Sequence, residues 1–224
     1  MSPVGRMRSL AQVNLMLRSP WMQVDDKLQA PDWFGAAARG ISFFPVMMSV
    51  YMLIYSGWWP MAWGISGTIA FVMVVALAVG FIVRGIGQIR HSTQFEVARS
   101  PEGDRIAKAM GILNSVTHPI WMLGMVVLLA FGQGRWVMPL MVFVIGAHFL
   151  PMARILNRWI DYPMGLLMIA FAILGGFSAA DPSVPWVEVF AIAGTGGAIT
   201  TGIYAAYMAV GYSRMTRAAG LSFP

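Results

Sequence analysis

Residues 40–83 read GISFFPVMMSVYMLIYSGWWPMAWGISGTIAFVMVVALAVGFIV, and these 44 residues include no lysine, arginine, aspartate or glutamate. A helix needs about 20 apolar residues to cross a bilayer, so the run is long enough for two crossings. The stretch SGWWP at 56–60 combines helix breakers with indole rings that favour the membrane interface. We therefore predict two membrane-spanning helices joined by a turn at 56–60.

The whole chain has the composition of a membrane protein. Hydrophobic residues make up 58% of its 224 residues and charged residues 11%, and the mean hydropathy is +0.69; soluble domains carry about 25% charged residues. Further charge-free runs predict an all-α fold, a polytopic bundle of six transmembrane helices at about 40–57, 61–84, 110–131, 137–156, 163–180 and 189–213. The predicted domains are an N-terminal segment 1–39, a transmembrane domain 40–213 and a tail 214–224.

The basic residues lie almost entirely on one side of the predicted spans. Fourteen of the 15 lysines and arginines precede the first span, separate the second from the third, or follow the fourth or sixth; Arg135 falls on the opposite side. The positive-inside rule places the basic side in the cytoplasm, so both termini are expected there. The net charge of +6 is thus an orientation signal, and the expected partner is the lipid bilayer, not nucleic acid.

Two cytoplasmic segments carry helical signals. Residues 7–18 place Leu10, Val13 and Leu17 on one face beside arginines, which predicts an amphipathic helix in the membrane interface. A partner-binding helix would show the same pattern. Residues 100–104, SPEGD, predict the start of a helix that leads into the third span, with Ser100 as its N-cap.

Polar side chains in the inner half of the membrane form a candidate binding pocket. His148 lies six residues before Arg154 and His118 ten residues after Lys108, so they are about 9 and 15 Å inside the cytoplasmic interface. Asn114 shares a helical face with His118 because the two are four residues apart. The candidate pocket residues are Asn114, His118, His148, Tyr204 and Tyr207.

Prolines beside both histidines allow two interpretations. Pro119 and Pro151 predict helix kinks that free the carbonyls of Ser115 and Ala147, and freed carbonyls in lipid need a partner. Neutral imidazoles can donate and accept hydrogen bonds, so the histidines could be structural and join the third span to the fourth. They could equally form a protonatable or ligand-binding pocket, since intramembrane ionisable residues often mark functional sites. The sequence leaves both interpretations open.

Small residues at four-residue intervals on the sixth span predict a surface for close helix packing. They are Gly194, Ala198, Gly202 and Ala206. Such a pattern lets another helix approach closely, and the partner is either internal or a second subunit, so a homo-oligomer or a larger membrane complex stays open.

No metal, cofactor or enzymatic activity is expected. Two histidines without a membrane-buried acid or cysteine make half a zinc site. The pairs Met48/Met52 and Met164/Met168 have a spacing found in cuprous-ion transporters, but packing is the favoured role among 19 methionines. The chain has no cysteine, nucleophile–base pair, carboxylate dyad or Walker sequence.

The stretch 144–151, VIGAHFLP, resembles a signature of a bacterial family of small multi-span membrane proteins of unknown function, which carry a Gly-Ala-His-Phe-x-Pro element in a late transmembrane helix. The likeness runs from Gly40 to about the fifth span. It implies that His148 and Pro151 belong to a shared pattern and that the chain lies in a bacterial inner membrane. It implies no activity.

The favoured function is a small carrier or permease with a polar, histidine-containing pocket in the inner half of the membrane. The alternative is a non-catalytic accessory or assembly subunit, which would bind through the sixth span, the cytoplasmic loop or the N-terminal helix. The kinked, polar inner halves of the third and fourth spans favour the carrier, because a subunit without a pocket has no use for them.

Overall fold

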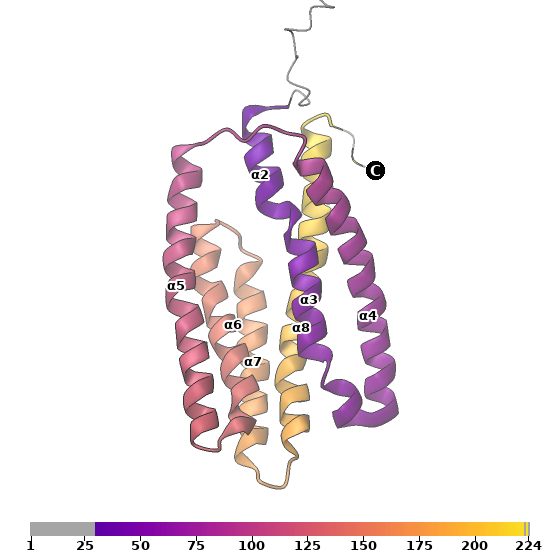
Figure 1. The fold of residues 1–224 in the computed structure, drawn as a ribbon, viewed down its shortest axis with the longest axis vertical. Coiled ribbons are helices and arrows are strands. Elements are labelled where there is room, and N and C mark those ends of the chain that lie inside the picture. Colours follow the sequence, from indigo (N-terminus) through magenta and orange to yellow (C-terminus); the bar gives the residue numbers. More distant parts are fainter. Residues whose placement is uncertain (1–29, 222, 224) are drawn as a thin grey trace, which may run out of the picture.

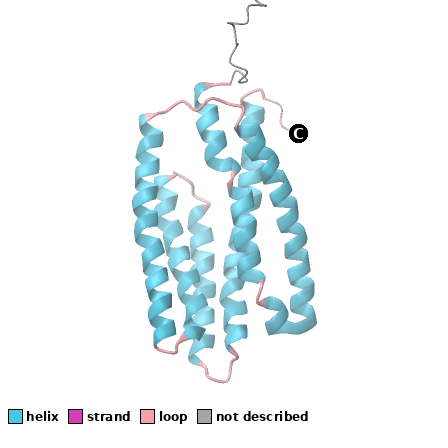
Figure 2. Cartoon of the chain, in the orientation of Figure 1, coloured by secondary structure: helices cyan, strands magenta, loops and turns pink. Residues whose placement is uncertain are grey.

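The computed structural model describes residues 30–221 and 223, and these residues form helices without a strand (Figures 1 and 2). The elements are α2 (Asp32–Ser42), α3 (Phe44–Ser56), α4 (Trp59–Ser92), α5 (Pro101–Ala130), the 3₁₀ turn η1 (Gly134–Trp136), α6 (Val137–Ile155), α7 (Asp161–Ala180) and α8 (Trp186–Ala218). Six stretches are long and apolar enough to cross a membrane, α2 and α3 together forming the first. The predicted all-α fold with six spanning-length helices is confirmed; the amphipathic helix predicted at 7–18 lies outside the described residues.

The turn between the first two spans lies where the sequence predicts it. α3 ends at Ser56 and α4 begins at Trp59. The first residues of α4 then lie across the end of the bundle, and the helix changes direction at Gly64, whose φ of 56° and ψ of −128° are readily adopted only by glycine (Figure 1). The Trp59 indole donates a hydrogen bond of 3.1 Å to Thr195 on α8, which fixes this bend to the bundle.

Helix α8 lies in the centre and packs against α3, α4, α6 and α7. The contact with α3 is close because a side chain at Gly194 would collide with the backbone of Tyr55, and one at Gly202 would lie 2.9 Å from the sulfur of Met52. Ala198 is buried and Ala206 half-buried. At Gly194 and Gly202, therefore, the helix that approaches the small-residue surface is α3 of the same chain.

Methionines fill much of the core between these helices. Met48 and Met52 on α3 and Met164 and Met168 on α7 are all buried in the main hydrophobic cluster. The packing role predicted for the two methionine pairs is therefore confirmed. Unbranched thioether side chains suit such a core, because they adapt to irregular spaces between helices.

The helices α4 to α8 differ in length. α6 and α7, with 19 and 20 residues, are about 30 Å long, the hydrocarbon thickness of a bilayer. α5 and α8 have 30 and 33 residues and are about 45–50 Å long, and the part of α4 that follows the break at Gly64 is about 42 Å long. Figure 1 shows the extra length at one end, where the α6–α7 turn stops well short of the ends of α5 and α8. The charged residues of α4 and α5 lie in the last nine residues of α4 and the first eight of α5, within this extra length.

A second, smaller core fills the same end of the bundle. Phe34 of α2 packs edge-on against Phe95, with ring centroids 4.7 Å apart, and Tyr212 of α8 and Phe223 join them. His91 Nδ1 and the Tyr212 hydroxyl are 2.7 Å apart, which links α4 to α8. Residues 32–39, which we predicted to precede the first span, are therefore part of a helix that packs against α4 and α8 and continues the first spanning stretch.

Arg135, the basic residue at the opposite end, stabilises the turn between α7 and α8. Its guanidinium donates hydrogen bonds to the carbonyls of Ser178, Asp181 and Val184 at 3.2, 2.6 and 2.9 Å, at the end of α7 where the helix dipole favours a cation. In the same turn the hydroxyl and backbone N–H of Ser183 hold the pKa of the Asp181 carboxyl below its usual value.

Replacing Gly64 with alanine is expected to destabilise the protein by about 1–3 kcal/mol, because an alanine there must adopt a backbone conformation that L-residues avoid. The matched control is Gly80→Ala on the same helix, where an added Cβ would contact nothing within 4 Å and stability is expected to be unchanged. Unfolding in mixed micelles with a denaturing detergent measures both. Equal stability of the two variants would mean that α4 does not break at Gly64.

Candidate functional site

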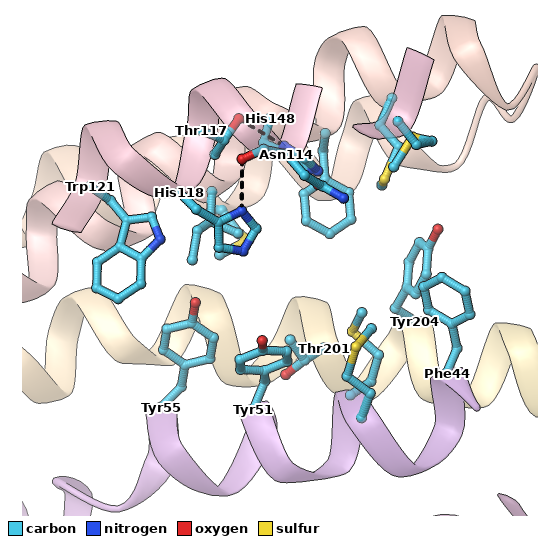
Figure 3. A pocket seen from close by; sticks show the side chains of 17 residues that line it. Phe44, Tyr51, Tyr55, Asn114, Thr117, His118, Trp121, His148, Thr201 and Tyr204 are labelled. Carbon is cyan, nitrogen blue, oxygen red and sulfur yellow. Dashed lines mark hydrogen bonds between the residues drawn. The ribbon is translucent and has the colours of Figure 1, made fainter. Parts of the chain in front are cut away.

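A cavity of about 350 Å³ lies between α3, α5, α6 and α8 (Figure 3). Its position follows from the packing of α5, which runs mainly along α6 and does not pack extensively against α3. Of the 17 described side chains that line the cavity, eight have rings and five are methionines, and none is a lysine, arginine, aspartate or glutamate. Four of the five candidate pocket residues, Asn114, His118, His148 and Tyr204, are among them.

The α5 wall presents one helical face. Asn114, Thr117, His118 and Trp121 are three or four residues apart and all line the cavity. His118 Nδ1 donates a 3.0 Å hydrogen bond to the carbonyl of Asn114. Because a carbonyl oxygen can only accept, this nitrogen carries the proton, and the other nitrogen of the neutral ring is then an acceptor.

The α6 wall is held to α5 through His148. Its Nδ1 lies 3.0 Å from the hydroxyl of Thr117, which is buried. On the other side of α6, Gly146 and Gly165 of α7 approach so closely that a Cβ on either would lie within 3.0 Å of the other's carbonyl oxygen. His148 thus projects from a helix that is packed tightly behind it.

Thr117 is the residue that the sequence prediction missed in this contact. It belongs to the same α5 face as Asn114 and Trp121, so its spacing was visible in the sequence. What the sequence does not show is the rotation of α5 about its axis, which decides that Thr117, and not His118, meets His148.

The two prolines do not interrupt their helices. α5 continues past Pro119 and α6 past Pro151. His118 bonds to the carbonyl of Asn114, one residue before the Ser115 carbonyl that Pro119 frees, and His148 bonds to a hydroxyl. Neither imidazole therefore has the predicted role of satisfying a carbonyl freed by proline.

Tyr207 does not line the cavity, which corrects the prediction that it belongs to the same pocket as Tyr204. Thr201 and Tyr204 face the cavity, whereas Tyr207 is rotated by about 120° from Thr201 around α8 and is 43% exposed. Its ring lies beside that of Tyr204, at a centroid distance of 6.3 Å.

Aromatic rings close the end of the cavity that lies toward the α6–α7 turn. Phe44 and Phe149 pack against Tyr204 with centroid distances of 6.0 and 5.6 Å. The guanidinium of Arg158 also lies on the Tyr204 ring, 5.4 Å from its centroid, in cation–π geometry. The cavity is therefore separated from the charged α6–α7 turn by one layer of rings.

Behind this layer lies an ion pair whose acidic member is buried and whose basic member is half-buried. Arg158 Nε and Asp161 Oδ2 are 3.3 Å apart, and Asp161 is fully buried. Arg158 Nη2 is buried without a hydrogen-bond partner among the described residues, whereas the Tyr204 hydroxyl lies close enough to the Asp161 carboxylate to interact with it. A lone buried charge is costly, so each member of the pair depends on the other.

Several polar groups that face the cavity have no hydrogen-bond partner in the described part of the chain. They are the hydroxyls of Tyr51 and Tyr55, the indole N–H of Trp121, the side-chain amide of Asn114, and Nε2 of both His118 and His148. Figure 3 shows Tyr51 and Tyr55 on α3 facing His118 and Trp121 on α5. Within hydrocarbon such groups need water or a ligand, because lipid tails have no hydrogen-bond donors or acceptors.

A metal centre has little support in this arrangement. Residues 30–221 and 223 contain no group of three histidine, cysteine, aspartate or glutamate side chains placed to hold a metal ion. The cavity itself offers two imidazoles, and structural zinc sites need four ligands.

Comparisons with known proteins add no family or fold relationship. No protein-family model, curated protein or solved structure matches the chain. The resemblance carried by the stretch 144–151 stays a prediction. Three of its residues do have a defined place here: Gly146 against α7, His148 on the cavity and Phe149 against Tyr204.

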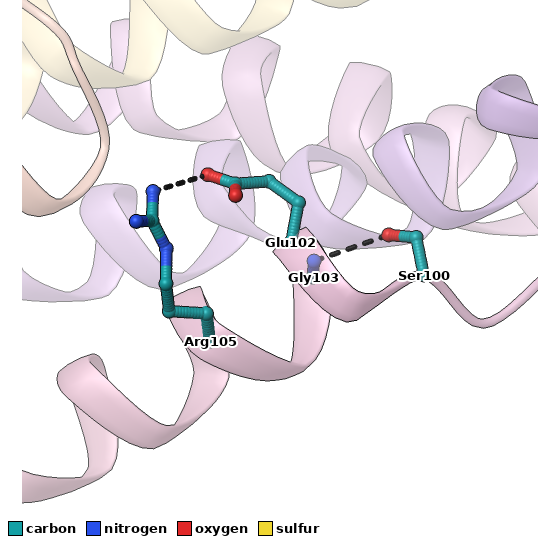
Figure 4. Close-up of polar contacts among 4 residues, drawn as sticks. All are labelled: Ser100, Glu102, Gly103 and Arg105. Carbon is teal, nitrogen blue, oxygen red and sulfur yellow. Dashed lines mark hydrogen bonds and ion pairs between the residues drawn. The ribbon is translucent and has the colours of Figure 1, made fainter.

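The start of α5 provides an exposed counterpart of the buried ion pair (Figure 4). Ser100 accepts a 3.1 Å hydrogen bond from the Gly103 N–H, which confirms the predicted N-cap. Glu102 and Arg105 form an ion pair of 2.8 Å, with side chains 64% and 77% exposed. Exposed pairs of this kind contribute less than about 1 kcal/mol.

Asp161→Ala is expected to lower the free energy of unfolding by about 1.5–3 kcal/mol, because it removes a hydrogen bond to the charged Arg158, whose side chain is only 18% exposed. Glu102→Ala, the matched removal of an acid from the exposed pair, is expected to cost less than about 1 kcal/mol. Unfolding by a denaturing detergent measures both variants. An equally small loss for both variants would show that the pair of Arg158 and Asp161 contributes no more than an exposed ion pair.

Proposed function

We propose that the protein is a multi-pass protein of the bacterial inner membrane, with both termini in the cytoplasm, and that it acts as a small carrier or permease with its substrate site in the cavity. The observation that supports this most is the set of unpartnered polar groups around one cavity between spanning-length helices. Groups of this kind are unfavourable in lipid unless something that enters the cavity binds them.

The proposed orientation rests on the basic residues. Ten of the 11 described lysines and arginines lie toward the end of the bundle that holds α2, the end of α4, the start of α5, the α6–α7 turn and the end of α8. Arg135 at the other end is bonded to three carbonyls, so its position has a structural cause of its own. The positive-inside rule then assigns the long helix ends to the cytoplasm.

The alternative function is an accessory or assembly subunit. Its predicted interface included the small-residue surface of α8, but Gly194 and Gly202 already contact α3. A subunit would also have no need of a cavity with unpartnered donors and acceptors. The carrier is therefore the better supported of the two.

Reporter fusions test the orientation. A reporter that is active only in the cytoplasm is expected to give signal when fused to either terminus, and a reporter that is active only outside the membrane is expected to give none. A fusion at 182–185, in the α7–α8 turn, should reverse both results. Signals from opposite sides for the two termini would contradict the even number of spans.

Solute uptake into proteoliposomes tests the function. The purified chain is expected to take up at least one of a panel of small uncharged solutes of graded polarity faster than protein-free liposomes do. His148→Ala should abolish this excess, and Tyr51→Phe should lower the apparent affinity by about two- to tenfold, the value of one lost hydrogen bond.

Tyr207→Phe is the matched control, since it removes the same hydroxyl outside the cavity, and it should behave like the natural protein. Uptake that equals that of protein-free liposomes for every solute, with a second protein co-purifying in stoichiometric amount from gentle detergent, would contradict the carrier and support the subunit.

A further inference from the structure

The shape and chemistry of the cavity narrow the class of molecule that fits it, and this inference rests on the proposed function. Charge is the first criterion. None of the described lining side chains carries a formal charge, and the nearest ion pair, Arg158 and Asp161, lies behind the Tyr204 ring. A charged ligand group would lose its hydration without gaining an ionic partner, so the cavity selects uncharged molecules.

The open side of the cavity is the second criterion. Tyr51 is 39% exposed, and Asn114 and His118 are exposed as well, so the cavity reaches the surface between α3 and α5. Both helices are there at the depth of α6, whose length matches the hydrocarbon layer. The opening therefore faces lipid, and a molecule that is dissolved in the bilayer can enter sideways.

The rings are the third criterion. Tyr51 and Tyr55 stand opposite His118 and Trp121 across the space (Figure 3), and methionines fill much of the remaining wall. Aromatic side chains attract a planar ring through stacked or edge-on contacts, and methionine sulfur also favours aromatic neighbours. An acyl chain alone would fill the volume but would use none of this geometry.

Hydrogen bonding is the fourth criterion. The Trp121 indole is a donor only, and Nε2 of neutral His118 is an acceptor because Nδ1 donates to Asn114. The tyrosine hydroxyls can do either. A matching ligand therefore carries oxygen atoms around its ring, as carbonyls that accept or hydroxyls that donate.

We propose that the cavity binds an uncharged, lipid-soluble, planar ring bearing carbonyl or hydroxyl oxygens, of the quinone or phenol class, which enters from the bilayer between α3 and α5. The ring lies between the Tyr51/Tyr55 side and the His118/Trp121 side. Its oxygens take up the hydrogen bonds that the protein leaves unmade.

Equilibrium binding to the full chain in lipid nanodiscs tests this proposal, with 2-methyl-1,4-naphthoquinone as the probe and quenching of tryptophan fluorescence as the readout. Saturable quenching is expected, and Trp121→Phe should remove most of the saturable part. Trp159→Phe is the control, since Trp159 is 76% exposed in the α6–α7 turn and should lower only the unsaturable part.

Two comparisons separate the criteria. The sulfonate of the same naphthoquinone, which adds one negative charge to the ring, is expected to bind at least tenfold more weakly. The double variant Tyr51→Phe, Tyr55→Phe should weaken binding of the uncharged probe by about tenfold, whereas Tyr207→Phe should leave it unchanged.

Three results would each overturn the proposal. The sulfonate could bind as tightly as the uncharged probe, or the quenching could be the same with and without Trp121. In the third, a monoacylglycerol binds saturably and the naphthoquinone does not. Failure here is distinct from failure of the carrier function. Uptake that depends on His148 but concerns only polar, ring-free solutes would overturn the ligand class alone, and saturable quinone binding without any uptake would overturn the carrier alone.

Discussion

The close contact of α8 with α3 and α7 is the interaction on which the rest of the structure depends. In lipid the association of helices gains nothing from excluding water, so it relies on close packing between small residues. Gly194 approaches the backbone of Tyr55, and Gly175 of α7 approaches Ala193. These contacts set the position of α3 and hence of Tyr55 on the cavity. α5 has no share in this packing, and the cavity is the space that its separate position leaves.

Polar side chains within the bundle form two sets with different roles. One set is satisfied locally: Ser49 and Thr201 bond to carbonyls one turn earlier on their own helices, and Thr117 bonds to His148 across helices. The other set faces the cavity and has no partner in the described chain. Within the first set, the bond between Thr117 and His148 joins two helices, as hydrogen bonds between membrane helices usually do, and the other two satisfy hydroxyls within one helix. The second set of polar groups makes no hydrogen bond that stabilises the fold, and it is therefore the main support for a bound ligand.

The features of this fold that the sequence predicts are those that depend on the length of its apolar segments. A charge-free run of 44 residues must cross twice, and the turn at 56–60 follows from its breakers and indoles. Helix rotation is not encoded in hydropathy, which is why Thr117 was missed and Tyr207 wrongly included. The helix from Asp32 was also not anticipated, because the apolar contacts of Phe34 and Ala38 are with residues distant in sequence. Gly64 shows the same limit, since a positive φ follows from the packing of Trp59 on α8.

The one-sided attachment of α5 has a mechanical consequence. This helix packs mainly along α6, it is joined to η1 through a turn in which Gly132 has a φ of 68°, and its other end follows an extended segment at 96–100. No tight packing holds it against α3, so the width of the cavity is governed by whatever pushes on α5 from outside. That agent is the surrounding lipid. For the proposed membrane protein, the lateral pressure of the bilayer, which varies with chain unsaturation and membrane curvature, would therefore act on the volume of the cavity.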